Sequence, residues 1–139
     1  MVTEDYVSFE TAKLLKEKGF NESIETLIGP EGIIYRLDEN SVSRQRHSTI
    51  SNSKINIYSE DVSCPTTQMA MKWLREVHNI SIEAVYDCSN GKTETISWWL
   101  ANIKHINSSS SKENDCLTAY DSYEESCEAA IKYCLENLI

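Results

Sequence analysis

The sequence is poor in glycine, proline and long apolar runs. It has four glycines and two prolines among 139 residues, and all four glycines fit turns or helix ends. A phosphate-cradling loop or a dinucleotide fingerprint needs glycines at fixed spacing, and neither pattern is present. No apolar stretch approaches the roughly 18 residues of a membrane span. These shortages argue against a nucleotide-binding enzyme and against a membrane protein.

Positive charge is also scarce. Lys and Arg number 13 against 22 Asp and Glu, which gives a formal net charge of −9. Nucleic acids and anionic membranes are bound through basic side chains, so both are unfavourable partners. The first residues lack the basic and apolar segments of a secretory leader. Five cysteines, an odd number, without a leader pattern lead us to expect reduced thiols in a cytoplasmic protein.

Residues suited to catalysis or metal binding are not grouped. The closest cysteines, Cys127 and Cys134, lie about 10 Å apart along one predicted helix, too far to share a zinc ion or a disulfide. The three histidines, His47, His78 and His105, fall in separate segments. His78 lies at a predicted helix end, where a cation complements the helix dipole. We therefore expect no metal, no cofactor and no catalytic activity.

Three segments have the periodicity and end signals of amphipathic helices. Ser8 is a natural N-cap for the first, and Gly19 followed by Phe20 predicts a Schellman stop. The second runs from about Pro65 to His78, and the last opens with a capping box at Ser122. The predicted core comprises Trp73, Leu74, Val77, Trp98 and Ile131.

Strands are predicted mainly as two hairpins. The first turns at Gly29–Gly32 between "TLI" and "IIYRL". Short additional strands are indicated at "KINIY" (54–58) and "CLTAY" (116–120). Two polar segments without periodicity, 38–54 and 107–115, predict surface loops.

The second hairpin contains the adjacent tryptophans Trp98 and Trp99, which must point to opposite faces of a sheet. A three-residue loop at Ser89–Gly91 places Ile82 opposite Trp98 and makes one face consistently apolar. In this register Trp98 faces the core, and Trp99 lies on the other face near Glu83. Trp99 is then either covered by the 38–54 loop or another helix, which we favour, or exposed as a contact residue.

Two charged clusters allow a functional interpretation. Arg44 and Arg46 concentrate positive charge in the 38–54 loop and could contact a small anion, although a solvated loop is the favoured interpretation. The acidic start of the last helix suggests a nucleic-acid mimic. A solvated face matched to the helix dipole explains it better.

The two ends and the middle of the chain carry a family resemblance. Its blocks read "VSFETAKLLKEKGFN", "PTTQMAMKWLREVHNISIE" and "YDSYEESCEAAIKYCLENLI". They resemble a group of short uncharacterised proteins of Bacteroides-type bacteria, their phages and mobile elements. The resemblance implies a phage or mobile-element setting. Because that group has no established activity, it assigns no functional residue.

These observations predict a single α+β domain over residues 1–139, with an antiparallel sheet and a long β-hairpin packed against about three helices. We expect a small, soluble, non-catalytic interaction protein that binds an unknown protein partner or itself, without a membrane or nucleic acid. The candidate contact residues are Trp99, Glu83, Arg44 and Arg46. The alternative is an acidic inhibitor or nucleic-acid mimic that acts on a defence or replication protein.

Overall fold

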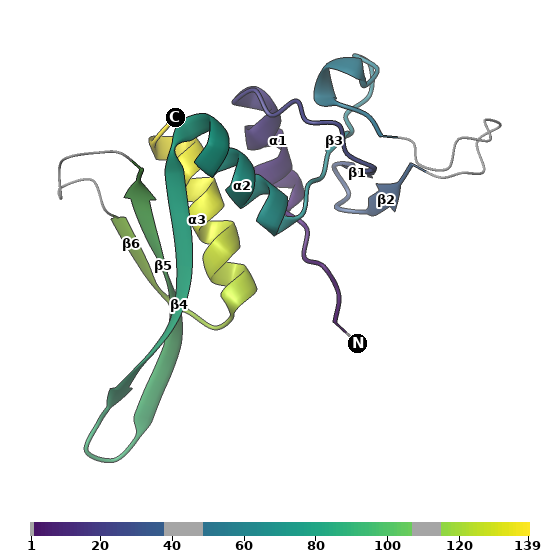
Figure 1. The fold of residues 1–139 in the computed structure, drawn as a ribbon. Coiled ribbons are helices and arrows are strands. Elements are labelled where there is room, and N and C mark those ends of the chain that lie inside the picture. The colour runs from purple at the N-terminus through teal and green to yellow at the C-terminus, as the bar shows by residue number, and fades with distance from the viewer. Residues whose placement is uncertain (1, 38–48, 107–114) are drawn as a thin grey trace. The chain divides into compact units, whose positions relative to one another are not determined.

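The computed structural model describes residues 2–37, 49–106 and 115–139. Contacts along the backbone divide the chain into two compact units, Met1–Thr66 and Thr67–Ile139. Each unit combines helix with a three-stranded antiparallel sheet (Figure 1). The predicted α+β class is therefore confirmed, whereas the single-domain organisation stays a prediction.

Helix α1 (Phe9–Glu17) begins and ends where the sequence predicts. The Ser8 side chain accepts a hydrogen bond from a backbone N–H of the first turn, which caps the helix. Gly19 has a φ of 95°, and the Phe20 N–H donates to the Leu15 carbonyl at 2.8 Å. This is the predicted Schellman stop, and it brings Phe20 and Leu15 into the core together.

The sheet of the first unit has β1 (Thr26–Ile28) between β2 (Ile34–Arg36) and β3 (Val62–Ser63). The predicted hairpin turn is present, since the Gly32 N–H donates to the Gly29 carbonyl at 2.9 Å. All of β1 is buried and all of β2 is exposed.

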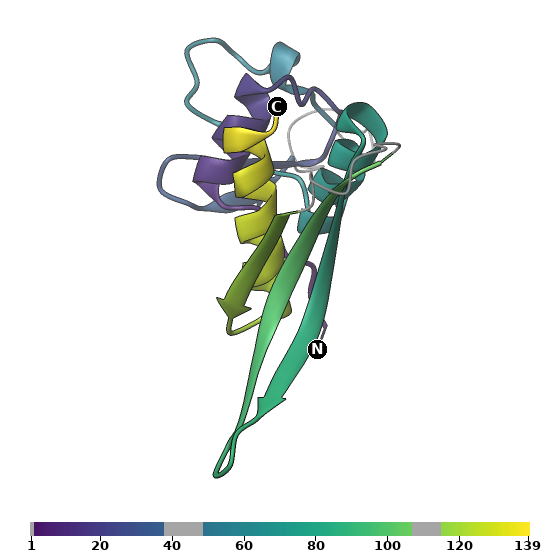
Figure 2. The ribbon, with the colours of Figure 1, turned by 90° about the vertical axis from the view of Figure 1, so that its left-hand side faces the viewer.

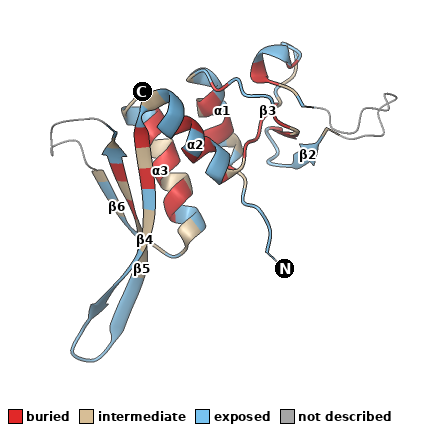
Figure 3. Cartoon of the chain, viewed as in Figure 1, coloured by how far each residue is buried: buried red, intermediate tan, exposed pale blue. Residues whose placement is uncertain are grey.

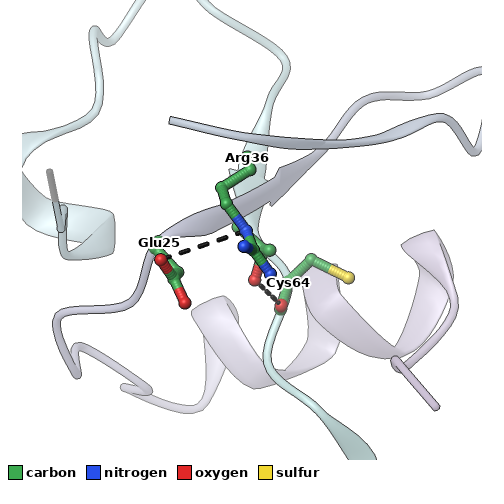
Figure 4. A network of polar contacts seen from close by, with 4 residues as sticks. Glu25, Arg36 and Cys64 are labelled. Carbon is green, nitrogen blue, oxygen red and sulfur yellow. Dashed lines mark hydrogen bonds and ion pairs between the residues drawn. The ribbon is translucent and has the colours of Figure 1, made fainter. Parts of the chain in front are cut away.

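Polar contacts differ greatly in environment along this sheet (Figure 4). The Thr26 hydroxyl donates to the Cys64 carbonyl at 2.6 Å in a buried position. Glu25 and Arg36 approach only to 4.0 Å, and both side chains are largely exposed. The buried bond therefore matters more to stability, because exposed ion pairs contribute little.

Asn52 ties two distant segments of the first unit together. Its side-chain amide donates to the Phe20 carbonyl at 2.7 Å, and its side-chain carbonyl accepts from the Ser63 N–H at 3.0 Å. Asn52 is buried and begins the 3-10 helix η1 (Asn52–Lys54). The prediction of a surface loop is therefore wrong at this end of 38–54, because a buried amide satisfies backbone groups there.

The predicted strand at 54–58 is also wrong. The segment forms a turn, in which the Ser59 N–H donates to the Asn56 carbonyl at 2.9 Å. Ile55 is buried, but Ile57 is 87% exposed, so the two isoleucines do not share a face. Residues 38–48, the rest of the predicted loop, lie outside the described residues.

The second unit is a sheet covered by helices on one face. Its strand order is β4 (Ile80–Asn90), β5 (Thr95–His105) and β6 (Asp115–Tyr120). Helix α3 (Tyr123–Asn137) packs on all three strands and α2 (Thr67–His78) packs on β4. Figure 1 shows both helices on one side of the sheet, and Figure 2 shows the opposite side.

Two details of this arrangement revise the predictions. Within its own unit the long-hairpin sheet packs against two helices rather than about three, because α1 belongs to the first unit and contacts β3. The strand predicted from "CLTAY" is present as β6, which already begins at Asp115. The rest of the predicted loop, 107–114, lies outside the described residues.

Helices α2 and α3 use the predicted end signals. The Ser122 side chain accepts from the Glu125 N–H at 3.1 Å, and the Glu125 carboxylate accepts from the Asp121 N–H at 3.2 Å. Asn79, directly after α2, has the left-handed φ of 56° that ends a helix.

The predicted core is largely, but not wholly, confirmed. Trp73, Leu74 and Ile131 are buried, whereas Val77 is 54% exposed and Trp98 is half-buried (Figure 3). Val77 lies in the last turn of α2, just before the chain turns into β4. Periodicity identifies the side of a helix that faces the core, but not where its packing partner ends.

His78 is a neutral packing residue rather than the predicted cation. Its ring meets the Trp73 ring edge-on, with centroids 4.7 Å apart. Burial lowers the pKa of His78 below the ordinary value of 6.5. Its buried Nε2 has no hydrogen-bond partner within the described part of the chain. The predicted charge interaction with the helix end is therefore wrong, because burial disfavours the charged form.

The cysteines divide into two groups. Cys64, Cys127 and Cys134 are buried, and Cys88 and Cys116 are exposed. Burial, with a smaller contribution from the nearby Asp115 carboxylate, raises the pKa of Cys134 to about 12. The buried thiols therefore act as small apolar groups in the core.

We expect Leu74→Ala to lower the free energy of unfolding by about 2–5 kcal/mol, because it leaves a cavity at a fully buried position. Val77→Ala on the same helix is the matched control and should change it by less than about 0.5 kcal/mol. Urea unfolding followed by circular dichroism measures both. Equal losses would contradict the orientation of α2.

A second prediction concerns acid stability. Above about pH 6.5 His78 is neutral in both the folded and unfolded states. As the pH falls below that value, the unfolded state takes up the proton more readily, so stability is lost. Urea unfolding of the wild type and His78→Phe between pH 5 and pH 8 isolates this contribution. We expect the wild type to lose more stability on acidification, and parallel profiles would contradict the burial of the imidazole.

Candidate interaction surface on the long hairpin

The register of the long hairpin differs from the predicted one. Ile82 pairs with Ile103, Tyr86 with Trp99, and Asp87 with Trp98. The loop comprises residues 91–94, closed by the Gly91 N–H donating to the Glu94 carbonyl at 2.9 Å. The prediction of a three-residue loop is therefore wrong.

The physical reason lies at the inner end of the hairpin. The buried residues that fix the register are Ile80, Ile82, Ala101 and Ile103, none more than 6% exposed. The predicted pairing used Trp98 and Leu100 as core partners, and it placed the inner end of β5 too early. The outer half of the hairpin extends beyond α3 and is exposed, so its sequence pattern does not constrain the pairing (Figures 1 and 3).

Trp99 lies on the face that α3 covers. Its ring centroid is 5.3 Å from that of Tyr86 and 5.5 Å from that of Tyr123, which it meets at 83°. These distances and the steep angle suit edge-to-face aromatic packing. The structure therefore reverses the predicted faces of the two tryptophans, and the case for an exposed Trp99 contact no longer holds.

The opposite side of the sheet carries an apolar row that no described helix of the second unit covers. We call this row and its polar neighbours the open face. Alternation along the paired strands places Ile96, Trp98 and Leu100 of β5 beside Val85 of β4. Ile96 is 61% exposed, and the other three are half-buried. This is the side turned toward the viewer in Figure 2.

Charged residues border the apolar row. Asp87 lies directly opposite Trp98, and the Glu83 carboxylate is 3.9 Å from the Lys104 ammonium. Both members of that pair are more than half exposed, so the pair is weak. The open face is therefore apolar along β5 and acidic along β4.

The predicted contact residues do not converge. Glu83 lies on the open face, Trp99 lies on the helix-covered face, and Arg44 and Arg46 lie outside the described residues. Sequence reasoning missed Trp98 as a surface residue. The alternating apolar residues at 96, 98 and 100 did signal one face, but they were assigned to the core.

The acidic start of α3 has a local structural role. Glu125 accepts a backbone N–H of the turn before the helix, and Glu124 lies in the first turn, where the helix dipole favours a carboxylate. The interpretation as a solvated, dipole-matched face accounts for both residues.

Other searches of the chain add little. Among the described residues, no group of three His, Cys, Asp or Glu side chains could hold a metal ion. The helices described here are all too short or too polar to cross a membrane. No family model, curated protein or solved structure matches the sequence significantly.

The reversed faces predict different effects for the two tryptophans. Trp99→Ala should lower the free energy of unfolding by roughly 2–3 kcal/mol, somewhat less than for a fully buried Trp. Trp98→Ala should cost less than about 1 kcal/mol, because its ring faces away from α3. Thermal and urea unfolding of both variants provide the comparison. A larger loss for Trp98→Ala would favour the originally predicted register.

Proposed function

We propose that the protein is a small, soluble, non-catalytic interaction protein whose open face binds a partner protein. The observation that supports this most directly is the apolar row at Ile96, Trp98 and Leu100, on the side of the sheet away from α2 and α3. Tryptophan is enriched among residues that dominate binding energy, particularly near the centre of an interface.

The charges of the open face favour a partner of particular chemistry. Asp87 and Glu83 lie along β4, and a weak pair with Lys104 is their one compensation on this face within the described strands. A partner surface with an apolar centre and basic residues on one side would complement this arrangement. A second copy of the chain fits less well, because each copy carries a net charge of −9.

The outer hairpin provides access to such a partner. Residues from Tyr86 to Ser97 are exposed, and they project beyond α3 in both ribbon views (Figures 1 and 2). A partner can therefore contact the row without displacing a helix. The phage or mobile-element setting implied by the family resemblance stays a prediction.

The test is capture of a partner from bacterial lysate with three baits: wild type, Trp98→Ala and Tyr58→Ala. Tyr58 is 89% exposed in the first unit and provides the matched aromatic control. We expect Trp98→Ala to weaken the captured complex by about 30-fold or more, as for an interface hot spot of about 2 kcal/mol. Tyr58→Ala should leave the affinity unchanged.

Salt dependence separates this proposal from the alternative of an acidic inhibitor. An apolar contact centred on Trp98 should persist when the salt concentration is raised, because ions do not screen apolar burial. A nucleic-acid mimic should lose its partner steeply under the same conditions. A complex insensitive to Trp98→Ala and lost at high salt would contradict the proposed function.

A further inference from the structure

A separate groove lies within the first unit, beside α1. Its volume is about 610 Å³, within the range of ligand-binding pockets. One wall is a single face of α1, formed by Phe9, Lys13, Lys16 and Glu17. The facing wall comes from residues 59–62 and from Pro30 in the β1–β2 turn. We call this the α1 groove. All its lining residues belong to one unit, so the site is complete without the other.

Both walls are held in place. Helix α1 is fixed from its other side by Thr11, Ala12 and Leu15, which are fully buried. The facing wall is fixed through Asp61, whose carboxylate accepts a hydrogen bond from the Tyr35 hydroxyl. Gly29 lies against the same carboxylate, since a Cβ there would lie 2.8 Å from Asp61 Oδ1. The groove is therefore preformed, which lowers the entropic cost of binding.

The surface of the groove is apolar with charges of both signs. Phe9, Pro30 and Val62 provide the apolar part. Lys13 extends over the Phe9 ring, with its ammonium 5.7 Å from the ring centroid.

Four charges border this apolar part, and none of them forms an ion pair within the described residues. They are Lys13, Lys16, Glu17 and Glu60. Two ammonium groups and two carboxylates are thus free to contact a ligand.

This combination excludes several ligand classes. A phosphate-rich ligand would be repelled by Glu17 and Glu60, and a cation alone by the two lysines. A purely hydrocarbon ligand would cover the charged groups without compensating them. The ligand that fits is dipolar, with an apolar body between a negative and a positive group.

We infer that the α1 groove binds a short peptide segment whose apolar side chains are flanked by one acidic and one basic residue. The apolar side chains pack on Phe9 and Val62. The acidic residue pairs with the lysines of α1, and the basic residue pairs with Glu60. This site is distinct from the open face and does not depend on the proposed function.

The test is a titration of the full-length, ¹⁵N-labelled protein with the capped tetrapeptide Glu-Leu-Leu-Lys, followed by amide chemical shifts. We expect saturable shifts at residues of the α1 groove, with a dissociation constant in the millimolar range or below. Two control peptides, Gln-Leu-Leu-Gln and Glu-Ser-Ser-Lys, remove the charges and the apolar part respectively, and both should bind more weakly. No saturable shift up to about 10 mM peptide, or equal binding of all three peptides, would overturn the inference.

Variants locate the site. Lys16→Gln and Glu60→Gln should each weaken binding of Glu-Leu-Leu-Lys about twofold to fivefold, as for a solvent-exposed ion pair. Lys92→Gln, in the hairpin loop of the second unit, is the matched control and should leave the affinity unchanged. The spectra of the variants also report that they are folded. Unchanged affinity in both groove variants would show that the peptide binds elsewhere.

Discussion

The packing of four side chains from β4 and β5 against the helices determines most features of the second unit. Ile80, Ile82, Ala101 and Ile103 are almost completely buried, and their pairing sets the register of the whole hairpin. Because side chains alternate between faces, a shift of one residue would exchange the surroundings of every other residue in both strands. The positions of Trp98 and Trp99, the weak Glu83–Lys104 pair and the open face all depend on this one contact.

Local signals were sufficient to predict where the helices begin and end. Ser8 and Ser122 cap their helices with a side-chain oxygen, and Gly19 and Asn79 adopt the left-handed conformation that ends a helix. Each effect involves residues only a few positions apart, so the sequence contains all the information. The same holds for the tight turn between β1 and β2.

Long-range packing could not be predicted in the same way. The hairpin register depends on which residues α3 buries, and Ile96, Trp98 and Leu100 have the same alternation as a true core face. Asn52 had no distinguishing sequence signal, because its two partners, Phe20 and Ser63, are distant in the chain. The α1 groove was missed for a related reason, since its walls come from separate segments.

The two surfaces show how stability and binding are separated in this chain. The inner half of the hairpin is buried and resists substitution, whereas the outer half contributes few buried groups and is free to present side chains to a partner. In the first unit, α1 buries Thr11, Ala12 and Leu15 on one side and presents unpaired charges on the other. In both units the residues that fix the backbone differ from those that are offered for binding. Substitutions on either surface therefore test binding with little effect on folding, because the buried side chains that hold each surface in place stay intact.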